Sequence, residues 1–220
     1  MDIIDVIEIQ NKLTAEIIGK KLILLKTVDS TNTYALNIIK DIKKIPDLTD
    51  RNGAVVISET QTGGRGRLGR KWFSPPGGIW MTIILQPDLK MQDLSKMTLL
   101  SASAISETLV NNYKISVNIK WPNDIYCNGK KLCGILAESE KVNSFTYVLI
   151  GIGINVNNDF FNDKNDHLNA VSLKEITASH INRNLLIAEI LNEFEAQYIF
   201  YSKTLDFKGI FKNIENIMIY

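Results

Sequence analysis

The dipeptide Asn128-Gly129 is the feature that most constrains the fold of this chain. Asn and Gly tolerate the positive φ angles of a two-residue turn, and strand-forming residues flank the pair on both sides. Residues 124–127 and 130–137 are therefore predicted to form an antiparallel hairpin. Such a hairpin favours a sheet with antiparallel neighbours over a purely parallel one.

A two-residue loop also predicts the register of this hairpin. Lys131 should lie opposite Tyr126, and Cys133 opposite Asp124, so that these four side chains share one face. A lysine beside a carboxylate suits a site that handles an anionic substrate. By itself, the same pattern is more typical of an ordinary hairpin that faces solvent.

Helices and strands are predicted in an irregular order along the rest of the chain. Apolar periodicity and turn residues predict helices over 1–20, 33–43, 93–113 and 182–203, strands over 22–25, 53–59, 79–85, 117–121 and 147–156, and a loop over 159–169. This order lacks the regular βαβα alternation of a parallel sheet. The predicted fold class is therefore α+β.

Composition excludes several classes of protein. The 220 residues carry 25 Lys and Arg against 24 Asp and Glu, a net charge of +1 that argues against a general nucleic-acid binder. The two cysteines are too few for a disulfide framework, and we interpret them as buried apolar side chains. No apolar run reaches the ~18 residues of a membrane span, and the N-terminus is acidic where a signal peptide is basic. A cytoplasmic protein is expected.

Residues 61–71 contain two partial nucleotide-binding motifs. Gly64, Gly66 and Gly69 spell G-x-G-x-x-G after a predicted strand, as in dinucleotide-binding folds, but the following Pro75-Pro76 leaves no room for the helix that this motif requires. The P-loop pattern also fails, because Arg70 and Lys71 stand where Lys and Ser or Thr are needed. We therefore reject both motifs.

The cations of this loop suggest a direct role instead. Four of them, at Arg65, Arg67, Arg70 and Lys71, occur within seven residues of an otherwise neutral chain. Guanidinium groups bind phosphate oxygens through two parallel hydrogen bonds, and the flat face of Trp72 could stack on a base. The loop is predicted to order around a polyphosphate. A solvated basic turn, or a basic loop that touches RNA, explains the composition equally well.

Two glycines interrupt the strand predicted over 147–156. Gly151 and Gly153 indicate close approach by a ligand or by another backbone, although a bulge would explain them too. Asn155, at the end of this strand, has an amide that could read the edge of an adenine.

Several of these segments, taken in order, closely resemble the signature blocks of biotin protein ligases. They are Asp29-Ser30-Thr31-Asn32, the run from Gln61 through GRGRLGR to Trp72, KWPND at 120–124, KLCGIL at 131–136, GIGINV at 151–156 and AVSL at 170–173. The resemblance spans residues 22–205. It implies a fold related to class II aminoacyl-tRNA synthetases, with a mixed, mostly antiparallel sheet flanked by helices. It also implies that biotin and MgATP form biotinyl-5′-AMP, from which a lysine of a biotin carboxyl carrier protein takes the biotin.

The same resemblance assigns roles to individual residues. Those implied for catalysis are Arg65, Arg67, Arg70, Lys120 and Lys131. Those implied for biotin are Ser30, Thr31, Asn32, Gln61, Gly64, Arg65, Lys131 and Gly134. Those implied for ATP or the adenylate are Arg67, Arg70, Trp72, Lys120 and Asn155. No metal ligand is assigned, and Asp124 is the one candidate for Mg²⁺.

The resemblance also sets expectations about domains and partners. Residues 1–205 are expected to form the catalytic domain, with 206–220 as a vestigial or truncated C-terminal segment. The residues before the first strand are too few for the helix-turn-helix domain of some family members, so no DNA binding is expected. No membrane partner is expected, and a homodimer is allowed. The rivals are a lipoate ligase or octanoyltransferase and a nonenzymatic nucleic-acid-binding module.

Overall fold

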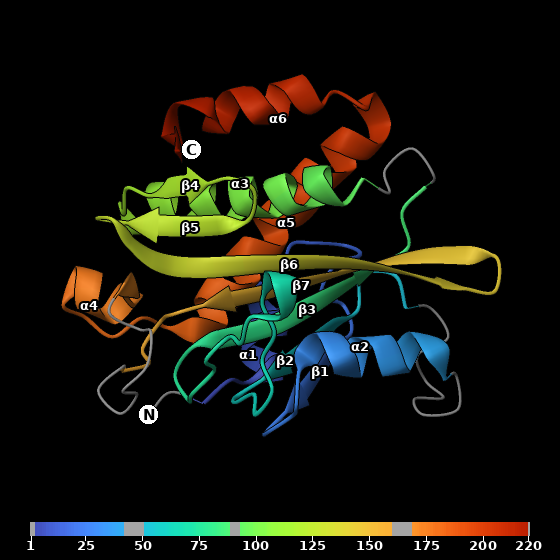
Figure 1. Cartoon of the computed structure of the whole chain (residues 1–220), viewed down its shortest axis with the longest axis horizontal. Helices are drawn as coiled ribbons and strands as arrows, with labels where there is room; N and C mark the ends of the chain where they lie inside the picture. The colour runs from blue at the N-terminus through green and yellow to red at the C-terminus, as the bar shows by residue number, and fades with distance from the viewer. Residues whose placement is uncertain (1–2, 42–50, 89–92, 160–168, 220) are drawn as a thin grey trace.

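One mixed sheet organises the chain, of which the computed structural model describes residues 3–41, 51–88, 93–159 and 169–219 (Figure 1). Its strands are β1 (Leu22–Leu25), β2 (Val55–Ser58), β3 (Ile79–Leu85), β4 (Asn118–Lys120), β5 (Asp124–Cys127), β6 (Lys130–Val142), β7 (Phe145–Ile154) and β8 (Met218–Ile219). They follow the order β1-β2-β3-β7-β6-β5-β4-β8. Only the outer pairs β1–β2 and β4–β8 are parallel, so the predicted α+β class with a mostly antiparallel sheet is confirmed.

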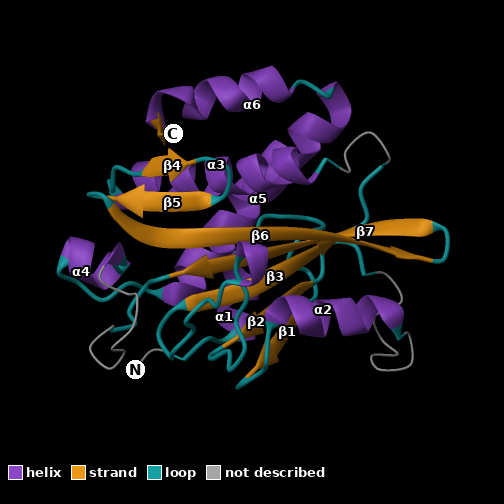
Figure 2. Cartoon of the chain, viewed as in Figure 1, coloured by secondary structure: helices purple, strands orange, loops and turns teal. Residues whose placement is uncertain are grey.

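Helices cover both faces of this sheet (Figure 2). They are α1 (Val6–Lys12), α2 (Thr31–Lys40), α3 (Leu94–Tyr113), α4 (Leu173–Thr177), α5 (Arg183–Thr204) and α6 (Phe207–Ile214), with 3-10 turns η2 (Arg67–Gly69) and η5 (Glu215–Ile217). The side chains of Ser30, Asp93 and Asn182 accept backbone N–H groups at the starts of α2, α3 and α5. These caps fix where the three helices begin, because each satisfies a donor without an intrahelical partner.

The two faces of the sheet bury different clusters of side chains. Val56 packs in a cluster with Ala35 and Ile39 of α2. Its neighbour Val55 points to the other face, into the larger cluster that contains Leu100 and the other buried apolar side chains of α1, α3 and α5. The face that carries α2 is called the α2 face below. Only part of it is covered by α2, and the rest carries the candidate site.

A β-bulge corrects the predicted hairpin register. Lys131 pairs with Tyr126 as expected, but the register then shifts, and Asp124 pairs with Gly134 rather than with Cys133. The extra residue turns both Leu132 and Cys133 toward the core, where each is fully buried. The prediction that Cys133 shares a face with Lys131 was therefore wrong.

The expected helix over 1–20 is only partly present. Among the described residues of this segment, the α-helix covers Val6–Lys12, and an irregular stretch follows along α5. Asn192 accepts the backbone N–H of Thr14, and Glu195 accepts that of Ile18. Because side chains of another helix satisfy these donors, the segment needs no helical hydrogen bonds of its own.

The C-terminal residues join the same sheet and core. Ile210 and Ile214 of α6 are buried in the larger cluster, and β8 pairs with β4 through Met218 and Ile119. The domain boundary expected at residue 205 stays a prediction. The expected loop over 159–169 lies almost wholly outside the described residues, as does the expected end of the helix over 33–43. None of the described helices is both long enough and apolar enough to cross a membrane.

Candidate ligand-binding site

The glycine-arginine loop, residues 61–74, folds back on itself over the α2 face. Gln61 N donates to Ser74 O over 3.1 Å, and Trp72 N donates to Gly64 O over 2.9 Å. A Cβ on Gly64 would lie 2.3 Å from the carbonyl oxygen of Trp72, so this close return requires glycine. The loop is drawn in teal in front of the sheet in Figure 1 and contains only the short turn η2, which supports rejecting the dinucleotide-binding motif.

Two paired glycines form a flat floor under Trp72. Gly134 of β6 and Gly153 of β7 are direct cross-strand partners. A Cβ on Gly153 would lie 2.4 Å from the indole nitrogen, and one on Gly134 would lie 2.9 Å from the ring carbon Cζ3. The ammonium of Lys131 lies 5.0 Å from the ring centroid. The close approach predicted at this strand is therefore made by a side chain of the loop.

Ser30, Thr31 and Asn32 are buried at the N-terminus of α2, with 3–4% of each residue exposed. Thr31 N donates to Gln61 Oε1 over 2.8 Å, and Gln61 Nε2 donates to Ser74 Oγ over 2.8 Å. The biotin-site residues predicted at the start of α2 are thus brought together with Gln61 of the loop. Their hydrogen bonds fix the loop's first residue against α2.

The cations of the loop have different surroundings. Arg65 forms a two-pronged salt bridge to Glu138, and Arg67 Nη1 donates to Asn123 Oδ1 over 3.2 Å. Arg70 and Lys71 are exposed and form no ion pair within the described part of the chain. They remain available for an anion from solution.

Lys131 and Asp124 form the closest ion pair of the site. Lys131 Nζ lies 2.6 Å from Asp124 Oδ2, as the predicted hairpin pairing of a lysine and a carboxylate suggested. The other oxygen, Asp124 Oδ1, is buried without a partner among the described residues, and so is the indole nitrogen of Trp72. Unpaired buried polar atoms are rare in native proteins, and two of those in the described residues lie within this cluster.

The pKa values of two titratable side chains near this ion pair are shifted. Burial raises the pKa of the Cys133 thiol, and the negative charge of Asp124 adds to this effect. The pKa of Tyr126 is raised by burial and by Asp124, while Arg70 opposes the shift. Cys133 is therefore an unreactive thiol, which agrees with its predicted role as a buried apolar side chain.

The other two predicted nucleotide contacts lie at the margin of this cluster. The Lys120 ammonium is exposed and lies 5.6 Å from the ring centroid of Tyr126. Asn155 is buried, accepts a hydrogen bond from Asn158 Nδ2 and donates a long one to Lys131 O. Its amide thus already has partners within the protein.

A protein-held metal centre has little support in the described ranges. They contain no group of three or more His, Cys, Asp or Glu side chains placed to hold a metal ion. Asp124 is a single carboxylate already paired with an ammonium. It could supply at most one ligand to Mg²⁺, an ion that often takes its remaining ligands from substrate phosphates and water.

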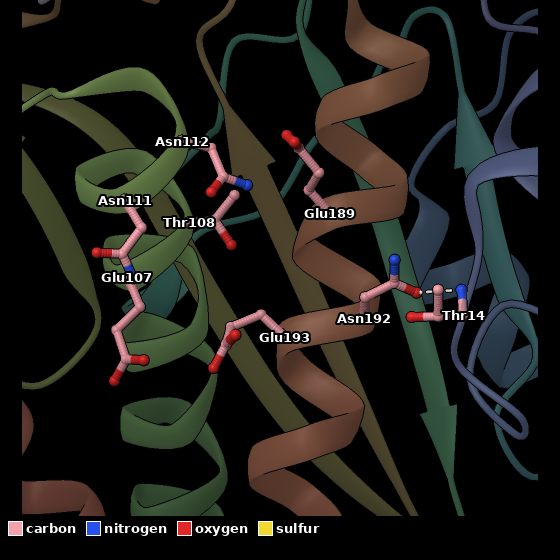
Figure 3. A pocket seen from close by; sticks show the side chains of 8 residues that line it. All are labelled: Thr14, Glu107, Thr108, Asn111, Asn112, Glu189, Asn192 and Glu193. Carbon is pink, nitrogen blue, oxygen red and sulfur yellow. Dashed lines mark hydrogen bonds between the residues drawn. The ribbon is translucent and has the colours of Figure 1, made fainter.

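Two pockets differ in charge. One of about 270 Å³ lies beside the loop between Arg67, Asn123 and the N-terminal turn of α3. The other, of about 340 Å³, lies between α3 and α5, and Figure 3 shows the carboxylates of Glu107, Glu189 and Glu193 around it. Three carboxylates without a lining cation would repel a phosphate. The loop side is therefore the candidate site for an anionic ligand.

Sequence reasoning missed three polar residues that organise this site, namely Thr82, Asn123 and Glu138. Alternation from Gly134 along β6 would have placed Glu138 on the α2 face. Thr82 offered no such signal, because its buried partners come from α2 and cannot be read from local pattern.

The floor of glycines, the indole and the cations together form a candidate site for an anionic ligand with a planar part. The chain belongs to the Biotin/lipoate A/B protein ligase family, whose sequence profile matches residues 24–155. It is 40% identical over 199 residues to the bifunctional ligase/repressor BirA of Bacillus subtilis, covering 87% of this chain and 58% of the relative. The chain thus spans less than two thirds of that relative's length.

Two further relatives agree with this assignment. A biotin--[acetyl-CoA-carboxylase] ligase of Paracoccus denitrificans is 35% identical over 136 residues, which cover 60% of this chain and 53% of the relative. The biotin protein ligase of Aquifex aeolicus, solved in complex with biotin and ATP, superposes with a TM-score of 0.77 at 31% identity. That superposition covers 91% of this chain and 79% of the other. The family resemblance seen in the sequence is confirmed.

Proposed function

We propose that this chain is an ATP-dependent ligase that activates biotin as biotinyl-5′-AMP and transfers it to a lysine of a biotin carboxyl carrier protein. The observation that carries the proposal is the packing of Trp72 over Gly134 and Gly153, with the Lys131 ammonium over its ring. The same loop carries Arg67, which hydrogen-bonds to Asn123, and Arg70, which is exposed. Relatives named as biotin ligases, one of them solved with biotin and ATP, support the same substrates.

In the first step, a carboxylate oxygen of biotin attacks the α-phosphorus of ATP and pyrophosphate leaves. Negative charge grows on the phosphate oxygens and on the leaving group. Arg67, Arg70, Lys120 and Lys131 would stabilise this charge, while the indole of Trp72 packs beside the adenylate. Removing one such preorganised donor typically costs about 2.7–4 kcal/mol of transition-state stabilisation.

In the second step, the uncharged amine of the carrier lysine attacks the carbonyl carbon of the adenylate, and AMP leaves with the bonding electron pair. A proton leaves the amine as the amide forms. The loop over residues 61–74 would exclude water meanwhile, because water would hydrolyse the mixed anhydride. Ser30, Thr31, Asn32, Gln61, Gly64 and Gly134 would border biotin, and Asn155 would lie behind Lys131 near the adenine.

We propose that Mg²⁺ enters with ATP and would neutralise phosphate charge. Asp124 is the one side chain that we propose as a ligand to it. A cytoplasmic location agrees with the two free cysteines but stays a proposal, as does a homodimer. The expected lack of DNA binding and the division into residues 1–205 and 206–220 also stay predictions.

The test is exchange of labelled pyrophosphate into ATP, followed by intact-mass analysis of a biotin carboxyl carrier domain. We expect biotin-dependent exchange and a mass increase of one biotinyl group. Arg67→Ala and Arg70→Ala should each lower the exchange rate about 10²–10³-fold. The matched control is Lys212→Ala, an exposed cation on α6, which should change nothing.

Two results would contradict the proposal. Exchange that depends on lipoate rather than biotin would assign the chain to the other branch of its family. Unchanged exchange in both arginine variants would remove the loop from the chemistry.

A further inference from the structure

The carboxylate of Glu138 links the glycine-arginine loop to the buried start of α2. Glu138 Oε1 accepts Arg65 Nη1 over 3.1 Å, and Oε2 accepts Arg65 Nη2 over 2.7 Å. Oε2 also accepts Asn32 Nδ2 over 2.8 Å. These partners are 73 and 106 residues away in sequence, so one side chain of β6 joins two segments that meet only in the folded protein.

The hydrogen bonds continue from Asn32 to strand β3. The Thr82 hydroxyl of β3 donates to Asn32 Oδ1 over 2.6 Å, and Asn32 in turn donates to Glu138. Gly151 makes room for this contact, because a Cβ there would lie 2.2 Å from Asn32 Oδ1. Asn32 thus accepts from Thr82 and donates to the carboxylate, and its Nδ2 makes a longer contact of 3.4 Å to Leu136 O. A donor to a carboxylate stabilises its negative charge.

This arrangement separates Arg65 from the other cations of the loop. Both of its terminal nitrogens are directed to Glu138, whereas Arg70 and Lys71 form no ion pair with described residues. Pairing also neutralises a carboxylate that would otherwise repel a polyphosphate. A half-exposed ion pair adds little stability to the folded protein, so its value here lies in fixing geometry.

We propose that Glu138 is a positioning residue that anchors the glycine-arginine loop through Arg65 and orients Asn32 for the biotin pocket. The inference rests on the proposed function for its ligands. The anchor itself is a property of the protein alone. Glu138 acts through Arg65 and Asn32 and touches no reacting atom.

The anchor is tested by hydrogen–deuterium exchange of the amides in residues 61–74, with the full chain, before and after adding biotin and ATP. Glu138→Gln should speed exchange of these amides about three- to tenfold without ligand, because it removes the charge that holds Arg65. The apparent KM for biotin should rise by a similar factor, with kcat changed less.

Glu140→Gln is the matched control. Glu140 lies on the same face of β6, has the same exposure as Glu138 (34% against 35% of the side chain) and also forms a 2.7 Å salt bridge, to Lys40. Its substitution should leave loop exchange and KM unchanged. Equal effects of the two variants would overturn the anchor, as would wild-type exchange in Glu138→Gln.

Arg65→Lys keeps the proposal testable if Glu138→Gln fails to fold, because Arg65 is exposed on the loop. A lysine retains the charge but loses the two-pronged contact, so exchange should again be faster than in the wild type. An unchanged rate would overturn the anchor. Lack of any biotin- and ATP-dependent protection in the wild-type loop would instead contradict the proposed function and leave the ligand-free comparison intact.

Discussion

At the scale of single residues, the site depends on two glycines that have no Cβ. Gly134 and Gly153 have no Cβ on the α2 face, and the indole of Trp72 occupies that space. The Lys131 ammonium lies over this ring, 5.0 Å from its centroid. The absence of a Cβ at these two glycines therefore allows the Trp72 ring to lie against the sheet.

Gly153→Ala is expected to displace Trp72. The added Cβ would lie 2.4 Å from Nε1 and 2.7 Å from Cε2, distances that real contacts do not reach. Overpacking of this kind typically costs about 1–3 kcal/mol, and here much of that cost would fall on the loop. We expect shifted tryptophan fluorescence and an apparent KM for ATP raised about tenfold, which is about 1.4 kcal/mol of binding free energy.

Gly209→Ala is the control for this substitution. Gly209 lies in α6, where alanine is the better helix former, and the nearest atom to its added Cβ is Asp206 Oδ2 at 3.3 Å. Fluorescence and KM should remain those of the wild type. A normal KM in Gly153→Ala would mean that Trp72 does not need the glycine floor.

At the scale of elements, side chains of α5 hold residues 14–18 in place, although the apolar periodicity of this segment predicts a helix. Glu195 of α5 accepts the backbone N–H groups of Glu16, Ile17 and Ile18 over 2.5, 2.8 and 2.6 Å. Asn192, one turn earlier, accepts those of Thr14 and Ala15. A segment with apolar spacing typical of a helix therefore forms an irregular stretch of bends and turns along α5.

Glu195→Ala should destabilise the fold by about 1–3 kcal/mol, because the buried N–H of Ile18 would lose its acceptor. The N–H groups of Glu16 and Ile17 are more exposed and would donate to water instead. Urea unfolding measures this change. Glu193→Ala, on the same helix, should cost less than about 0.5 kcal/mol. Equal losses in the two variants would show that the three hydrogen bonds contribute little.

At the scale of the whole molecule, the C-terminal residues extend the sheet and core that the rest of the chain builds. Ile214 is fully buried in the larger cluster, and β8 adds an edge strand next to β4. Packing of this kind predicts that α6 unfolds together with the sheet.

Ile214→Ala is therefore expected to cost about 2–5 kcal/mol of unfolding free energy, as in other large-to-small core substitutions. Ile219→Ala, in β8 and 39% exposed, should cost under about 1 kcal/mol. Circular dichroism and tryptophan fluorescence should report one common transition for both. Separate transitions would indicate that residues 206–219 fold as an independent unit.

The sequence by itself determined the features that depend on neighbours within a few residues. The helices predicted to begin at 33, 93 and 182 begin within two residues of those positions, at Thr31, Leu94 and Arg183, and the Asn128-Gly129 turn forms the hairpin. The strand predicted over 79–85 has the bounds of β3. The cationic loop was also visible, because its charges and glycines lie in one short run.

Only the tertiary structure decided the pairings between distant segments. The strand order, the bulge that buries Cys133 and the contact of Glu138 with Arg65 and Asn32 depend on how the sheet closes around its core. Local propensity depends on a few neighbouring residues, whereas packing brings together side chains from distant parts of the chain. The partners of Glu138, a carboxylate in the middle of β6, therefore could not be predicted from the residues around it in the sequence.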